Sequence, residues 1–161
     1  MIHKEKTKIQ HALISVSDKT GIVEFAQKLE KRGIKILSTG GTARTLSDAG
    51  VTVQEISDYT AFKEIMGGRV KTLHPKVFGG ILGLRNQDKQ IAKKLGIVWI
   101  DLVVCNLYPF GDVIRKESPT FEEASENIDI GGSALIRSGA KNMGWVTVIT
   151  HPKDYPLIID E

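Results

Sequence analysis

Residues 67–75 read Gly-Gly-Arg-Val-Lys-Thr-Leu-His-Pro, and this segment places two cations directly after a pair of glycines. Glycine lets the backbone turn and approach a ligand closely. Arg69 offers a planar fork of donors, whereas Lys71 offers a compact ammonium group on a flexible stem. The combination indicates a site for an anionic small molecule. A solvated turn that carries two surface charges explains the same residues, and this segment alone does not decide between the two interpretations.

A second candidate for anion binding is the turn Thr39-Gly40-Gly41-Thr42, which precedes a predicted helix. Glycines expose backbone N–H groups, threonines add hydroxyls, and the N-terminus of a helix carries a partial positive charge. The turn is neither a Walker A loop nor a GxGxxG fingerprint. A glycine-rich turn with a threonine helix cap fits equally well. Lys19 follows another predicted strand and lies in the first turn of a helix, where an anionic ligand would offset its unfavourable position.

The apolar spacing predicts alternating strands and helices that would position these segments. Strands are predicted at 11–16, 34–37, 51–56, 102–105 and 145–149, and helices at 22–29, 43–49, 88–95, 111–116, 120–126 and 134–142. The order β-α-β-α-β in the first third predicts a parallel sheet with helices on its faces. Residues 57–78 lack strong periodicity and are predicted to be a long irregular insertion, residues 79–84 a short strand or turn, and His151 the start of a last helix or turn.

Polar clusters follow several of the predicted strands, and ligands bind beyond the carboxyl ends of the strands in an open parallel sheet. Three of the clusters are Ser17-Asp18-Lys19, Thr39 to Thr42, and Asn106 with Tyr108. A fourth, Asp129-Ile130-Gly131-Gly132, precedes a predicted helix. Each has a purely structural alternative. Asp129 suits a helix N-cap, Asn106 a turn, Tyr108 a core position and Lys141 the C-terminal turn of a helix.

Composition limits the classes of function. The 161 residues, 41% of them hydrophobic and 25% charged, predict one globular domain, 11–161, behind a polar tail, 1–10. A net charge of +3 is too weak to indicate nucleic acid, and no apolar run is long enough to span a membrane. The single cysteine, Cys105, predicts an inert core thiol and a reducing, cytoplasmic location. No group of residues has metal-ligand spacing, and His74 is interpreted as structural.

Five motifs occur in an order that resembles the IMP cyclohydrolase domain of the bifunctional purine-biosynthesis proteins known as PurH. They are Ser15 to Gly21, Thr39 to Thr42, Gly68 to Pro75, Cys105 to Phe110 and Ile128 to Gly132. The resemblance covers about His11 to Tyr155. It implies the methylglyoxal-synthase-like fold, an α/β three-layer sandwich with a mostly parallel central sheet.

The resemblance also implies an activity and a set of site residues. Members of the family close the purine ring of 5-formamidoimidazole-4-carboxamide ribotide (FAICAR) to give IMP and water, with no metal or organic cofactor. The positions that match the family's catalytic residues are Lys71, Tyr108, Asp129 and Lys141. The positions that match its nucleotide-binding residues are Ser17, Asp18, Lys19, Thr39, Gly40, Gly41 and Thr42 near the phosphate, and Arg69, Val70, Lys71, Thr72, Cys105, Asn106, Asp129, Ile130 and Gly131 near the base.

The chain departs from the family in two respects. It ends at Glu161, where the family's cyclohydrolase region continues for several helices, and it lacks the transformylase domain, so formyl transfer and its folate are expected to be absent. Methylglyoxal synthase is disfavoured, because Arg69 stands where that enzyme has an acidic residue. A non-catalytic module that binds a nucleotide or phosphate stays open as the alternative. No nucleic-acid or membrane partner is expected, and the sequence leaves a homodimer open.

Overall fold

The computed structural model describes residues 8–160 and is built on a sheet of five parallel strands in the order β3-β2-β1-β4-β5. The strands are β1 (His11–Val16), β2 (Lys35–Ser38), β3 (Val53–Glu55), β4 (Leu102–Asn106) and β5 (Thr147–Ile149). The predicted α/β class is confirmed, and the sheet is wholly parallel within these residues.

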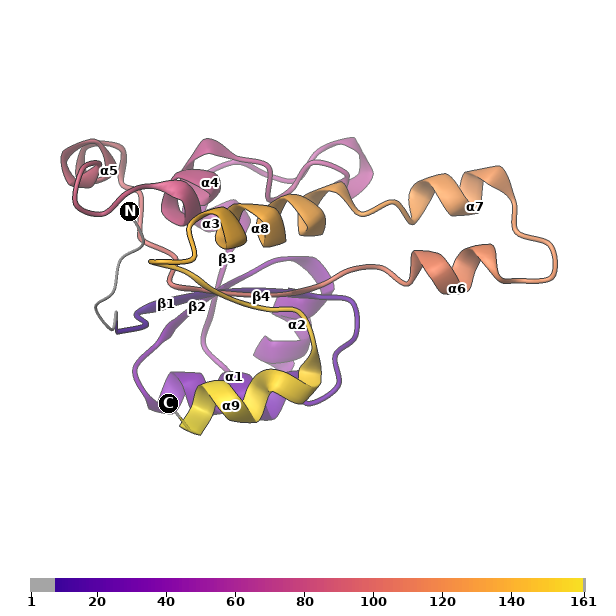
Figure 1. Ribbon diagram of the computed structural model, residues 1–161, viewed down its shortest axis with the longest axis horizontal. Coiled ribbons are helices and arrows are strands. Elements are labelled where there is room, and N and C mark those ends of the chain that lie inside the picture. The colour runs from indigo at the N-terminus through magenta and orange to yellow at the C-terminus, as the bar shows by residue number, and fades with distance from the viewer. Residues whose placement is uncertain (1–7, 161) are drawn as a thin grey trace.

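Helices cover both faces of this sheet, as Figure 1 shows. One layer holds α1 (Ile22–Lys31), α2 (Gly40–Asp48) and α9 (Tyr155–Asp160). The other holds α3 (Ile56–Thr60), α4 (Pro75–Leu82) and α8 (Ile130–Lys141), with α5 (Lys89–Leu95) at its edge. Short 3₁₀ turns occur at η1 (Met66–Gly68) and η2 (Pro152–Asp154).

The central strands are apolar throughout because they are buried on both faces. In β1, Ala12 and Ile14 pack in the core beneath α1, whereas Leu13 between them packs in the core shared with α4 and α8. In β4, Val104 likewise packs in the core beneath α1, and Val103 packs in the core shared with α4 and α8. This double burial fixes the register of the strands, so the loops at their carboxyl ends have fixed positions.

The prediction of an irregular segment at 57–78 is wrong in part, because α3 extends to Thr60, η1 covers Met66–Gly68 and α4 begins at Pro75. The short strand or turn predicted at 79–84 is wrong, since Gly79 and Gly80 lie inside α4. A Cβ atom at Gly80 would lie 2.5 Å from the carbonyl oxygen of Val98, and one at Gly79 would lie 3.0 Å from Cδ1 of Ile97. These glycines therefore allow close packing of a helix, which local sequence spacing does not reveal.

Two helices also begin earlier than predicted, and β3 is shorter. Helix α2 begins at Gly40 and α8 begins at Ile130, so both glycine pairs lie in first helical turns. Close packing explains the glycine at position 132, since a Cβ atom there would lie 2.7 Å from Oδ2 of Asp129. The turn residues thus form the N-termini of helices that point towards the carboxyl edge of the sheet.

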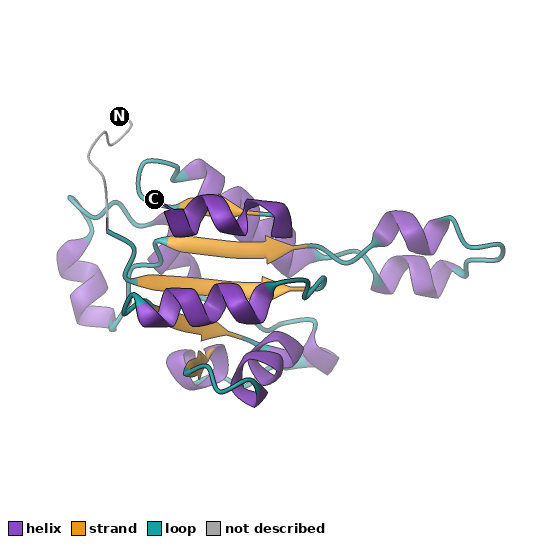
Figure 2. Ribbon diagram, turned by 90° about the horizontal axis from the view of Figure 1, so that it is seen from below, coloured by secondary structure: helices purple, strands orange, loops and turns teal. Residues whose placement is uncertain are grey.

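The hairpin, residues 107–128, runs out from the sheet and back, as Figure 2 shows. It holds α6 (Phe110–Ile114) and α7 (Phe121–Glu126) side by side. The predicted helix at 120–126 is confirmed, and α7 begins with a capping box: Thr120 Oγ1 accepts from Glu123 N, and Glu123 Oε2 accepts from Thr120 N, both at 3.1 Å. The base of the hairpin adjoins the strand ends.

The predicted N-terminal tail lies mostly outside the described residues, which begin at Lys8. Within its last residues, Ile9 packs against the core, and Gln10 N donates to Oδ2 of Asp101 at 2.7 Å. None of the helices found among residues 8–160 is both long and apolar enough to cross a membrane.

Candidate functional site

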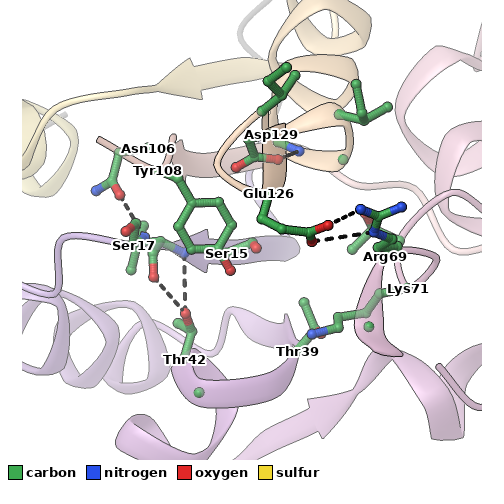
Figure 3. Close-up of a pocket in the computed structure, with 18 of the residues that line it drawn as sticks. Ser15, Ser17, Thr39, Thr42, Arg69, Lys71, Asn106, Tyr108, Glu126 and Asp129 are labelled. Carbon is green, nitrogen blue, oxygen red and sulfur yellow. Dashed lines mark hydrogen bonds and ion pairs between the residues drawn. The ribbon is translucent and has the colours of Figure 1, made fainter. Parts of the chain in front are cut away.

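A pocket of about 610 Å³ lies at the carboxyl ends of β1, β2 and β4 (Figure 3). Predicted site residues that line it are Ser17, Lys19, Thr39, Gly41, Thr42, Arg69, Lys71, Thr72, Asn106, Tyr108, Asp129, Ile130 and Gly131. Predicted site residues that do not line it are Asp18, Gly40, Val70, Cys105 and Lys141. The structure therefore gathers segments that lie between Ser15 and Gly132 in the sequence around one cavity.

Two of the polar residues at the pocket hold its loops in place. Thr42 is buried, and its Oγ1 donates to the carbonyl oxygen of Val16 at 3.0 Å and accepts from Val16 N at 3.2 Å. Oδ1 of Asn106 accepts from the backbone N–H of Ser17 and Asp18 at 2.7 and 2.9 Å. Because these polar atoms are already bonded, both residues shape the pocket more than they offer groups to a ligand.

Lys71 lies against the N-terminus of α2, beside Thr39 (Figure 3). A Cβ at Gly40 would lie 3.1 Å from Nζ of Lys71, so Gly40 contributes by leaving room for this side chain. The Lys71 Nζ lies 3.0 Å from Oε2 of Glu64, a residue that sequence reasoning missed. The ammonium group is thus held between a carboxylate and the positive end of a helix.

Arg69 forms an ion pair with Glu126 (Figure 3), which belongs to the hairpin and was also missed. The guanidinium meets both carboxylate oxygens: Nε donates to Oε2 at 3.4 Å, and Nη2 donates to Oε1. Both residues line the pocket, so the pair joins the hairpin to the segment 65–74 at the pocket wall. A carboxylate in the last turn of a helix is unfavourable, and that signal marks Glu126 as a residue with another role.

Asp129 caps a helix and also lines the pocket. It is the N-cap of α8, where Oδ1 accepts from Gly132 N at 2.7 Å. Tyr108 is 55% exposed and lines the same pocket, so its interpretation as a core aromatic is wrong. The rest of the pocket lining consists of Glu126 and seven other residues: Ser15, Val16, Gly67, Gly68, Ser125, Ile128 and Gly132.

Three predicted binding residues lie behind or beside the pocket. Cys105 is buried with Sγ 3.7 Å from the carbonyl oxygen of Gly132; burial, with a smaller effect of the Asp129 charge, raises the pKa of its thiol to about 12. Val70 exchanges backbone hydrogen bonds with Ile65 at 3.1 and 3.3 Å. Oδ1 of Asp18 accepts from Thr20 N at 2.9 Å, and hydrogen bonding by Thr20 lowers the pKa of this carboxyl.

Lys141 requires a correction, because the chain does not bring it to the pocket. It is the last residue of α8, whereas Asp129 caps the first turn. Twelve residues at the helical rise separate them by about 18 Å along the axis. Lys141 instead lines a separate hollow with Leu82 and Arg137. Because α8 has this length, its N-terminus lies at the pocket and its C-terminus lies away from it. The order of the motifs in the sequence does not reveal this separation.

Among residues 8–160, no grouping of three or more His, Cys, Asp or Glu side chains could hold a metal ion. The pocket offers instead backbone N–H groups at two helix N-termini, three cations, hydroxyls and two carboxylates. Such a set suits an anionic ligand with additional polar groups.

Comparison with known proteins agrees with this architecture. The model of the MGS-like domain family matches residues 21–134. The crystal structure of a protein named ForH superposes with a TM-score of 0.84 at 36% sequence identity, over 95% of this chain and 79% of that one. The chain belongs to the MGS-like domain family.

Proposed function

We propose that the chain is an IMP cyclohydrolase, which closes the purine ring of FAICAR and releases water. The observation that carries the proposal is the gathering of Lys71, Tyr108 and Asp129 with the Thr39 turn around one cavity of about 610 Å³. These residues come from motifs far apart in the sequence. A cavity of this size suits a nucleoside monophosphate.

In the proposed reaction, the carboxamide nitrogen attacks the formyl carbon. One proton leaves the carboxamide and one leaves the formamido nitrogen, and the former formyl oxygen departs as water. Because an amide nitrogen is a poor nucleophile, much of the acceleration comes from holding the two groups in contact. We assign the remaining work to donors near the formyl oxygen and to a proton acceptor near the carboxamide.

Lys71 and Tyr108 are the proposed donors to the developing oxyanion. Asp129 is the proposed proton acceptor, since the Gly132 N–H occupies its Oδ1 and leaves Oδ2 for a ligand. The phosphate is assigned to Ser17, Lys19 and the N-terminus of α2, where backbone N–H groups point out of the helix. No step is assigned to Lys141, which lies at the far end of α8.

The alternative is a non-catalytic module that binds a nucleotide or phosphate in the same pocket. The separation of Lys141 from the pocket favours it, because the four residues implied by the resemblance are not assembled within this chain. Such a module would keep the phosphate site but would form no IMP. Binding without turnover therefore distinguishes the two proposals.

An absorbance assay of IMP formation from FAICAR tests the proposal. Lys71→Ala removes one oxyanion donor, and we expect turnover to fall about 100- to 1,000-fold. Lys63→Ala is the matched control, because Lys63 is an exposed lysine of the same segment outside the pocket lining. Full activity of Lys71→Ala would remove Lys71 from the mechanism, and a wild type that binds the nucleotide without forming IMP would establish the module.

A further inference from the structure

The charges of the pocket are unevenly distributed. Near the α2 N-terminus, Lys19 and the helix end are positive. Near the α8 N-terminus, Arg69 lies with two carboxylates, Glu126 and Asp129, all lining the pocket (Figure 3). Lys71 lies against the α2 N-terminus, and its charge is paired with that of Glu64. One end therefore attracts an anion, while the other carries one more negative charge than positive.

The contact between Arg69 and Glu126 fixes the guanidinium through two of its nitrogens, Nε and Nη2. The third nitrogen, Nη1, makes no hydrogen bond or ion pair to any of residues 8–160. The Arg69 side chain is 65% exposed and lines the pocket, so Nη1 is left without a protein partner beside the cavity. A guanidinium held in this way presents a directed donor while its charge is offset by the carboxylate.

The position of Glu126 supports a role beyond the stability of the hairpin. It ends α7, where the helix dipole disfavours a carboxylate, and an exposed pair of this kind contributes only about 0–1 kcal/mol to folding. The same helix keeps Glu122 and Glu123 in its first turn, where acids are favourable. Glu126 is thus the acid of α7 whose location is explained by the pocket.

We propose that Glu126 is a specificity-determining residue, which orients Arg69 and offsets its charge so that this end of the pocket accepts an uncharged hydrogen-bond acceptor in preference to a carboxylate. The inference rests on the proposed function, because it assumes that the heterocycle of a nucleotide lies between Arg69 and Asp129. A carboxamide satisfies Nη1 without adding charge. A carboxylate at the same place would face two carboxylates and only one guanidinium.

Calorimetric titration with two nucleotides tests this inference. One is 5-aminoimidazole-4-carboxamide ribonucleoside monophosphate, and the other is its 4-carboxylate counterpart, which differs only in the group that would face Arg69. The wild type is expected to bind the carboxamide more tightly. Glu126→Gln frees Arg69, so we expect the ratio of the two dissociation constants to shift towards the carboxylate by about 3- to 10-fold at low ionic strength.

Two further variants serve as controls. Glu122→Gln removes the same charge from the same helix outside the pocket lining, and its ratio is expected to equal that of the wild type. The double variant Arg69→Gln with Glu126→Gln lacks the freed guanidinium. Its ratio of dissociation constants should therefore not shift towards the carboxylate. An unchanged ratio in Glu126→Gln overturns the inference and leaves the proposed function standing. Failure of both nucleotides to bind the wild type overturns the proposed function and the inference with it.

Discussion

Two of the arginine–carboxylate pairs found among residues 8–160 lie at opposite edges of the sheet, and they differ in burial. At the amino edge, Nη1 of Arg85 lies 2.7 Å from Oδ1 of Asp101, and the two side chains are 10% and 5% exposed. The Arg85 guanidinium also lies over two indole rings, 5.9 Å from Trp99 and 5.4 Å from Trp145. At the carboxyl edge, Arg69 and Glu126 are 65% and 59% exposed.

The difference in burial separates a structural pair from a pair available to a ligand. Burial lowers the pKa of Arg85, and Asp101 opposes that shift. Asp101 also accepts from Gln10 N and His11 N at 2.7 and 2.9 Å, so it anchors the start of β1. Among residues 8–160, Glu126 accepts side-chain hydrogen bonds from Arg69 alone, and solvent weakens the Coulomb energy of this exposed pair. The same chemistry therefore stabilises the fold at one edge and remains available for recognition at the other.

The largest expected effect is on stability at the buried pair. Asp101→Asn leaves the Arg85 guanidinium buried without a counter-charge, and we expect a loss of about 3–5 kcal/mol. Glu126→Gln should change stability by about 0–1 kcal/mol. Urea unfolding followed by circular dichroism measures both. Equal losses in the two variants would contradict the contrast drawn between the edges.

The next effect concerns the geometry of the pocket. A Cβ at Gly132 would lie 2.7 Å from Oδ2 of Asp129 and 2.8 Å from Cδ2 of Leu107. Gly132→Ala should displace the Asp129 carboxylate and lower kcat/KM for FAICAR about 100-fold. Gly111→Ala is the control, since its Cβ would make an ordinary contact of 3.5 Å with Arg115. Wild-type kcat/KM in Gly132→Ala would show that the position of Asp129 does not matter.

Burial of Cys105 leads to a prediction about pH. Because burial raises the pKa of this thiol from 9.0 to about 12, the folded protein holds almost no thiolate at pH 8. Iodoacetamide should label Cys105 only after unfolding. By linkage, the contribution of this group to stability is complete below about pH 9 and is lost as the pH rises towards 12. Labelling of the folded chain at the rate of a free thiol would refute the inert core position.

The smallest effect is expected at a second ion pair beside the pocket, Lys71 with Glu64, whose side chains are 31% and 56% exposed. Glu64→Gln should leave the unfolding free energy within about 1 kcal/mol of the wild type. It should lower the KM for FAICAR a few-fold, because Lys71 loses a competing carboxylate. A stability loss as large as that of Asp101→Asn would show that the Lys71–Glu64 pair stabilises the fold as the buried pair does.

Sequence patterns predicted the sheet better than they predicted the pocket wall. The continuous apolar run at Val103 and Val104 leaves little choice but a buried central strand, and the clusters after each strand follow from parallel topology. Glu126 and Glu64 were missed because their partners lie far along the chain or across a turn. Gly79 and Gly80 misled the prediction, since glycine marks a turn and a close helix contact equally well.

The proposed catalytic residues also fall into two groups, those that line the pocket and one that does not. Motif order gathered Lys71, Tyr108 and Asp129 around one pocket. Tyr108 follows β4, Asp129 caps α8, and Lys71 lies against the N-terminus of α2 from the irregular segment before α4. Lys141 was assigned with them although it ends the helix that Asp129 begins. Sequence resemblance transfers residue identity, whereas the length of α8 decides which residues meet within one chain.

The fate of the formyl oxygen tests the central claim most directly. FAICAR labelled with ¹⁸O in its formyl group is incubated with the chain, and the products are analysed by mass spectrometry. Ring closure predicts unlabelled IMP and labelled water, at a rate that Lys71→Ala lowers about 100- to 1,000-fold. Labelled formate with the deformylated amine, or no product from a chain that binds the nucleotide, would contradict the account.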